Sequence, residues 1–156
     1  MTAGAATPRP PHLRPAVMAM VALGGAIGTG AREAISLAVP PVDGVPVAIL
    51  GINIVGAFLL GVLLETLLLR GPDVGRRRDL RLFLGTGVLG GFTTYSALAV
   101  DSGLLLLGGR PVVGVLYVVG SVVLGVLASA LGIALARRAR GRGTTAGPVP
   151  DGGEAA

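Results

Sequence analysis

The sequence predicts an all-α integral membrane protein, and three observations support this fold class. First, 52% of the 156 residues are hydrophobic and only 13% are charged, against roughly 25% charged in an ordinary soluble domain. Second, the apolar residues form four runs, each long enough to supply the ~20 residues of a membrane-spanning helix. Third, no run alternates polar with apolar residues, as a membrane-spanning strand would.

Charge and proline separate the four predicted spans. In chain order the spans cover residues 16–39, 47–69, 82–107 and 111–136. Together they make a predicted four-helix transmembrane channel domain at 16–136. It follows a proline-rich, disordered leader at 1–15 and precedes a tail at 137–156 that is first basic and then disordered. The first run is too long for the apolar region of a cleaved signal peptide, so we expect it to remain as a helix.

The first two spans carry isolated polar residues. Arg32 and Glu33 lie late in the first span, where the arginine either extends to the membrane boundary or supplies a charge to a pore vestibule. Asn53 lies among glycines in the second span. Its amide either bonds a neighbouring helix or serves function, because polar groups in hydrocarbon are costly without a partner.

The third span predicts an interrupted helix. Residues 85–96 concentrate glycine, threonine and serine, which propagate a helix poorly. Broken backbone at membrane depth is tolerated only when protein buries it, and its freed carbonyls suit a small hard cation. The alternative is a continuous helix with a small-residue packing face. Tyr95 lies near the expected break, and the positive edge of its ring can face an anion.

In the fourth span Tyr117 and Ser121 are four residues apart and therefore share one helical face. This face is either a hydroxyl-lined track or an interhelical hydrogen-bonding seam. The chain contains no cysteine and a single histidine, His12, in the leader. These counts exclude a disulfide framework, a thiol nucleophile and a cysteine-type zinc site, and we expect no enzyme.

Arginine distribution predicts how the spans are oriented. All 13 basic residues are arginine. With four crossings, 11 of them lie on one side, only Arg110 lies on the other, and Arg32 lies inside a span. Basic residues in short loops stay cytoplasmic, so we expect a multi-pass protein of the cell membrane with both termini cytoplasmic. No basic face with interleaved aromatics exists, which argues against nucleic-acid binding.

Three sequence blocks, taken together, resemble the signature segments of the Fluc/CrcB family of fluoride channels. They are GGAIGTGAR at 24–32, NIVGAFLLG at 53–61 and GVLGGFTTYS at 87–96. The blocks occur in the family's order and at its four-helix spacing, and the resemblance covers residues 16–136.

The resemblance implies a dimer of subunits inserted antiparallel, with two fluoride pores along the interface. Its function would be passive export of cytoplasmic fluoride, which reduces toxicity. It further implies a structural Na⁺, not transported, held by the backbone carbonyls of Gly90 and Thr93, and a vestibule arginine at Arg32. The positions that match the family's anion path are Asn53, Tyr95, Ser96, Leu98, Tyr117 and Ser121.

Two departures from the family pattern point to a heterodimer. Tyr95 and Leu98 stand where the family has two phenylalanines, and Leu98 has no polarised ring edge to offer an anion. The arginine bias also argues against insertion of one sequence in both orientations. We therefore expect a homologous four-helix partner with the opposite bias.

Two other functions compete with the channel. A non-conducting partner or scaffold subunit would explain the altered ring positions. A small proton-coupled multidrug exporter would need a mid-membrane carboxylate in the first span, and Glu33 lies too late in that span.

Overall fold

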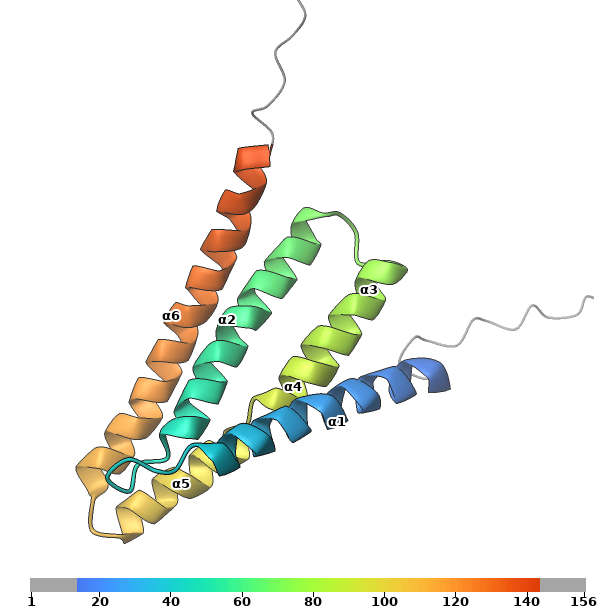
Figure 1. The fold of residues 1–156 in the computed structure, drawn as a ribbon. Helices are drawn as coiled ribbons and strands as arrows, with labels where there is room; N and C mark the ends of the chain where they lie inside the picture. The colour runs from blue at the N-terminus through green and yellow to red at the C-terminus, as the bar shows by residue number, and fades with distance from the viewer. Residues whose placement is uncertain (1–13, 144–156) are drawn as a thin grey trace, which may run out of the picture.

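The computed structural model describes residues 14–143, and this part of the chain is helical apart from its connections and one isolated bridge between Val42 and Val45. Figure 1 shows the arrangement. The elements are α1 (Pro15–Ala38), α2 (Val47–Leu69), α3 (Arg76–Leu80), the π-helix η2 (Arg81–Leu89), α4 (Gly90–Phe92), α5 (Tyr95–Leu107) and α6 (Pro111–Gly143). The predicted all-α class is confirmed.

Three helical segments have the length and apolar composition needed to cross a membrane. They are Val47–Leu69, Arg76–Leu107 and Pro111–Gly141. The remaining predicted span forms α1, which has 24 residues and carries Arg32 and Glu33 in its C-terminal half. By these two criteria the described residues give three spans, and the crossing of the bilayer by α1 stays a prediction.

The fourth predicted span is longer in the structure than in the prediction. α6 continues to Gly143, past the predicted end of the fourth span at Ala136, so the first part of the basic tail is helical. The leader and tail predictions otherwise fall on residues 1–13 and 144–156, which lie outside the described residues.

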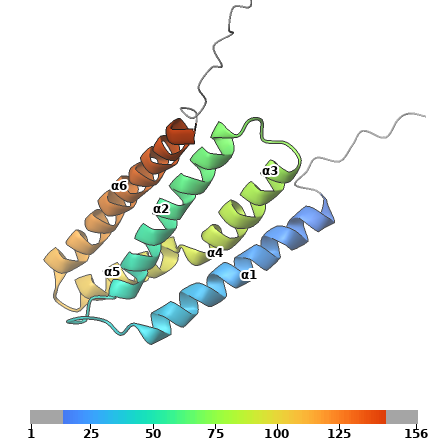
Figure 2. The ribbon, with the colours of Figure 1, turned by 45° about the horizontal axis from the view of Figure 1, so that its top comes forward.

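Close backbone contact joins α1 to the first half of the third span. α1 packs on η2 and α4, while α2 packs on α6 (Figure 2). Gly24 and Gly28 of α1 are buried, and a Cβ at Gly28 would collide with the backbone of Val88. Gly87 and Gly91 approach α1 from the other side. Such small-residue faces let membrane helices approach closely where water supplies no hydrophobic driving force.

The arginine-rich segments gather at one end of the molecule. Figures 1 and 2 place the start of α1, the α2–α3 connection and the end of α6 together, away from the other two connections. At this end Arg137 pairs with the buried Glu65 at 2.8 Å and joins α6 to α2. Arg81, the first residue of η2, pairs at 2.7 Å with Asp73 of the α2–α3 connection, and its hydrogen bond holds the pKa of Asp73 below the usual value.

The opposite end contains two short connections that one arginine joins. Arg110, which precedes α6, donates a hydrogen bond of 2.5 Å to the Asp43 carbonyl in the α1–α2 connection. Asp43 and Gly44 have φ of 51° and 75°, and Val42 and Val45 exchange both backbone hydrogen bonds around them. This is the backbone of a two-residue turn with both central φ angles positive, for which Asp-Gly is a preferred sequence.

We expect Gly28→Ala to destabilise the fold, because its new methyl group has no space against Val88. Overpacking of this kind costs about 1–3 kcal/mol in free energy of unfolding. Thermal unfolding of the purified protein in detergent measures the effect. Gly30→Ala is the matched control, since a Cβ at Gly30, on the same helix, meets no atom within 4 Å. Equal melting temperatures for the two variants would contradict the proposed backbone contact.

Candidate functional site

The third span is interrupted by two extended residues. α4 ends at Phe92 and α5 begins at Tyr95, while Thr93 and Thr94 have ψ of 155° and 124°. The predicted break is therefore confirmed, and a continuous helix is wrong for this segment. The small-residue packing face of the alternative interpretation is present as well, on the stretch before the break, where Gly87 and Gly91 meet α1.

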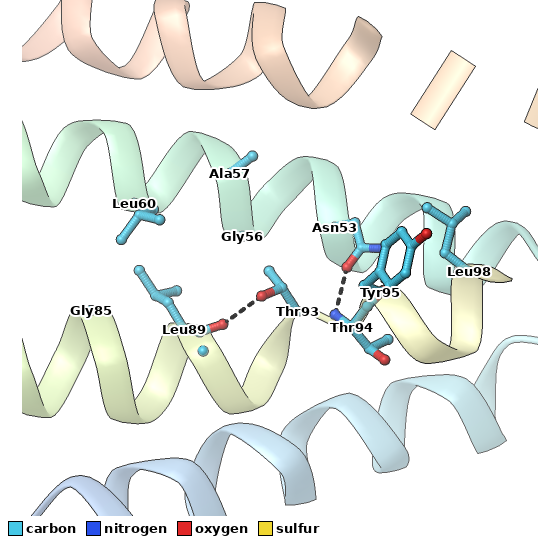
Figure 3. A pocket seen from close by; sticks show the side chains of 11 residues that line it. Asn53, Gly56, Ala57, Leu60, Gly85, Leu89, Thr93, Thr94, Tyr95 and Leu98 are labelled. Carbon is cyan, nitrogen blue, oxygen red and sulfur yellow. Dashed lines mark hydrogen bonds between the residues drawn. The ribbon is translucent and has the colours of Figure 1, made fainter. Parts of the chain in front are cut away.

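The side chain of Asn53 on α2 satisfies the broken backbone. Its Nδ2 donates to the Thr94 carbonyl at 2.9 Å. Its Oδ1 accepts from the Thr94 N–H at 2.8 Å, the bond drawn in Figure 3. The amide thus pairs with both backbone groups of one extended residue, as a neighbouring strand would. Thr94 is buried, and unpaired backbone groups in such a place cost free energy. The pairing explains how an interrupted helix persists here.

The two threonines of the break cap the helices on either side. The Thr94 hydroxyl accepts from the Ala97 N–H at 3.2 Å, which is the side-chain cap of α5. The same hydroxyl lies 3.1 Å from the Ser96 hydroxyl. The Thr93 hydroxyl donates to the Leu89 carbonyl at 2.9 Å, and its methyl group packs where Gly56 of α2 leaves space. A side chain at Gly56 would collide with that methyl group.

The end of α4 deprives backbone carbonyls of their helical donors. The last carbonyls of any helix lack their donors four residues ahead. For the Gly90 carbonyl that donor would be the Thr94 N–H, which bonds Asn53 instead. Gly90 and Thr93 both line the same groove, at the negative end of a helix. Neutral carbonyl oxygens at a helix C-terminus are the ligands that a hard monovalent or divalent cation accepts, so these residues fit the expected sodium.

An open groove of about 360 Å³ runs between α2 and the interrupted span (Figure 3). Tyr95 is 82% exposed at this groove, and Leu98 is only 6% exposed, because it also packs into the core formed with Ile49, Ile52, Leu105 and Tyr117. The residues that line the groove are Asn53, Gly56, Ala57, Leu60, Gly85, Leu89, Gly90, Thr93, Thr94, Tyr95 and Leu98. Five of the nine predicted site residues thus lie together: Asn53, Gly90, Thr93, Tyr95 and Leu98.

The other four predicted residues do not line this groove. Ser96 is beside it, bonded to Thr94. Tyr117 is buried and its hydroxyl donates to the Pro46 carbonyl at 3.0 Å, while the buried Ser121 donates to the Tyr117 carbonyl at 2.6 Å. The Tyr117 bond joins α6 to the start of α2, as an interhelical seam does. Arg32 lies on α1, and its buried Nε has no hydrogen-bond partner among the described residues.

Sequence reasoning missed two residues of the site. Thr94 supplies the backbone that Asn53 holds, and Gly56 supplies the space for Thr93. A threonine three residues before a helical N–H is a recognisable cap signal, so Thr94 could have been found. Gly56 gives no such signal, because its neighbour is distant in sequence.

Comparison with known families agrees with this architecture. The family model described as CrcB-like protein, Camphor Resistance (CrcB), matches residues 19–133. The chain belongs to the CrcB family. The match begins within α1 and ends within α6, so the groove and the break fall inside it.

Relatives of this CrcB-family chain carry consistent names. A protein of Leifsonia xyli subsp. xyli, named fluoride-specific ion channel FluC 2, is 53% identical over 126 residues, which are 81% of this chain and 87% of the relative. A protein of Cutibacterium acnes, named fluoride-specific ion channel FluC 1, is 48% identical over 130 residues, or 83% of this chain and 91% of the relative. Fluoride-specific ion channel FluC of Ruminiclostridium cellulolyticum is 40% identical over 119 residues, or 75% and 89%.

Removal of the Asn53 amide should destabilise the break. In Asn53→Leu the Thr94 N–H and carbonyl lose their partners, and each unsatisfied buried group costs about 1–3 kcal/mol. We expect a clearly lower melting temperature in detergent. Ser96→Ala is the control, because it removes one hydroxyl–hydroxyl contact at the same break, leaves both Thr94 backbone groups paired, and should cost no more than about 1 kcal/mol. A melting temperature for Asn53→Leu equal to that of the control would show that the amide does not support the break.

Proposed function

We propose that this chain is a subunit of a fluoride channel, which lets cytoplasmic fluoride leave passively and so limits its toxicity. The observation that carries the proposal is the groove at the helix break, lined by Asn53 and Tyr95, in a chain of a family whose members are named fluoride-specific ion channels. The chain belongs to a family whose members are named ion channels, a class of transporter and not of enzyme.

The groove offers weak anion contacts of the kind that conduction requires. An amide nitrogen has two hydrogens, and Asn53 uses one of them for Thr94, so the second is able to donate to an anion. The exposed Tyr95 adds a ring edge of partial positive charge beside it. Neither group carries a full charge, and a pore must release the ion as readily as it binds it.

Asn53→Asp tests the anion path. Aspartate has no N–H to donate to fluoride or to Thr94, and its negative charge repels the ion, so we expect fluoride efflux from proteoliposomes that contain the assembled channel to be lost. Tyr95→Phe, which keeps the ring edge and removes only the exposed hydroxyl, is the companion variant and should retain flux. A fluoride electrode measures both. Unchanged efflux from folded Asn53→Asp protein would remove Asn53 from the pore.

A structural Na⁺ is the second part of the proposal. The carbonyls of Gly90 and Thr93 fit such an ion, and a second subunit would supply the remaining oxygens. When bound, the ion would neutralise the carbonyl dipoles that meet at the break. Asn53 binds the Thr94 N–H, which would be the helical donor to the Gly90 carbonyl.

Exchange of Na⁺ for the large organic cation N-methylglucamine tests this site. We expect a lower melting temperature and a smaller dimer fraction without Na⁺, because uncompensated carbonyls would face each other. Potassium at the same ionic strength controls for nonspecific salt effects. Identical melting in all three salts would contradict the sodium site.

A dimer of four-span subunits inserted antiparallel would complete the pore. One subunit leaves the groove open and Tyr95 82% exposed, which supports a partner on this face. With α1 as the fourth crossing, both termini and the α2–α3 connection lie on one side, and the arginine bias assigns that side to the cytoplasm.

We further propose that the partner is a homologous chain with the opposite arginine bias. The bias argues against insertion of one sequence in both orientations. Leu98 is an alkyl core residue at a position where the family has an aromatic ring, so the partner would supply the better-preserved anion path. This burial also favours the second candidate, a non-conducting subunit that mainly completes its partner's structure.

Reconstitution with and without a partner separates these possibilities. We expect the chain alone to give little fluoride efflux and the co-expressed pair to give full efflux. Full efflux from the chain alone would exclude an obligate partner. If the pair conducts, Asn53→Asp in this chain only should reduce efflux when the chain contributes to a pore, and leave efflux unchanged when it serves as a scaffold.

A further inference from the structure

A second groove, outside the proposed pore, lies at the arginine-rich end of the molecule. It has a volume of about 570 Å³ and lies between the start of α1 and the junction of α3 with η2. Figure 2 shows α1 running alongside these helices. Val17, Met18, Val21 and Ala22 form the wall on α1, and Leu82 faces them from η2.

The walls of this groove are apolar and accessible. Met18 is 59% exposed, and Ala22 is also exposed. Within a membrane-spanning chain such a surface meets hydrocarbon, and a concave apolar surface along two helices fits one acyl chain better than a flat helix face does. The chemistry of the walls thus selects a lipid tail.

Two arginines complete the groove at its membrane-boundary end. Arg78 and Arg81 line it, with 25% and 38% of their side chains exposed, and no acidic residue is among its lining residues. Each guanidinium pairs with one carboxylate outside the groove, Asp79 at 3.3 Å and Asp73 at 2.7 Å. A guanidinium has five N–H donors, so donors remain for another anion.

The surrounding charge favours an anion as well. The segment 70–81 contains five arginines and two aspartates, so its net charge is positive. Arginine binds phosphate oxygens with a geometry that lysine does not reproduce. Basic pockets between transmembrane helices on the cytoplasmic side bind the headgroups of anionic lipids.

We propose that this groove binds an anionic phospholipid, with its phosphate headgroup at Arg78 and Arg81 and one acyl chain along Val17, Val21 and Leu82. The lipid would seal the seam between α1 and the interrupted span and hold α1 against η2. The proposal goes beyond ion conduction, because it concerns a different face of the chain and needs no pore.

Native mass spectrometry tests the proposal on the full-length protein. The protein is equilibrated with equal amounts of phosphatidylglycerol and phosphatidylcholine that carry the same acyl chains. We expect phosphatidylglycerol adducts to dominate, and Arg78→Gln to weaken them about fivefold, since one basic residue near a membrane contributes about that much. Arg76→Gln removes the same charge from the same segment outside the groove and should weaken the adducts clearly less than Arg78→Gln does.

A third variant tests the acyl site without any change in charge. Ala22→Phe places a ring in the groove and should reduce adducts of phosphatidylglycerol while both arginines remain. Equal binding of the two lipids, equal loss in Arg76→Gln and Arg78→Gln, or displacement of the lipid by inorganic phosphate at equal concentration would each overturn the proposal. Because binding is the readout, a failure here is distinct from a failure of fluoride conduction.

Discussion

The pairing of the Asn53 amide with the Thr94 backbone is the interaction on which this architecture depends. A helix cannot simply stop at membrane depth, because its free N–H and carbonyl groups would face hydrocarbon. Asn53 supplies one donor and one acceptor at the spacing that one extended residue presents. With those two bonds in place, Thr93 and Thr94 stay extended between α4 and α5, and the Thr94 N–H is not available to the Gly90 carbonyl.

The rest of the fold holds the two halves of the interrupted span from opposite sides. Glycine faces bring α1 against η2 and α4 ahead of the break. Beyond the break, α5 packs on α6, and Leu98 joins a core with Ile49 and Tyr117. The break is therefore a fixed bend between two anchored segments, and the open groove follows from it.

Local chemistry made much of this architecture predictable. Runs of apolar residues bounded by Pro40, Pro46 and Arg70 gave helix limits close to those observed for α1 and α2. The density of glycine and threonine at 85–96 predicted an interruption, because these residues are poor helix formers. The sequence blocks that resemble the CrcB family predicted that Asn53 and the break belong to the same channel site. The family match confirms the resemblance itself.

Features that depend on distant contacts were beyond the sequence. Asn53 and Thr94 are 41 residues apart, and nothing local says that both polar atoms of the amide meet one residue's backbone. The sequence allowed two roles for the Tyr117 hydroxyl, in a polar track or in a hydrogen-bonding seam between helices. Its bond to the Pro46 carbonyl follows only from how α6 lies against α2. The π-helical hydrogen bonding of η2 was also missed, because the glycines at 85 and 87 do not distinguish a π-helix from an α-helix.

The solitary arginine of the arginine-poor end has a consequence for biogenesis. In the orientation proposed from the arginine bias this end is translocated during insertion, and insertion scales assign about 2.5–3.5 kcal/mol to an arginine or aspartate at the centre of a spanning helix. At this end the chain carries such a charge at two positions, Asp43 and Arg110. Arg110 joins the α5–α6 connection to the α1–α2 connection through the Asp43 carbonyl. In the proposed orientation this contact can form only once both connections have crossed the bilayer.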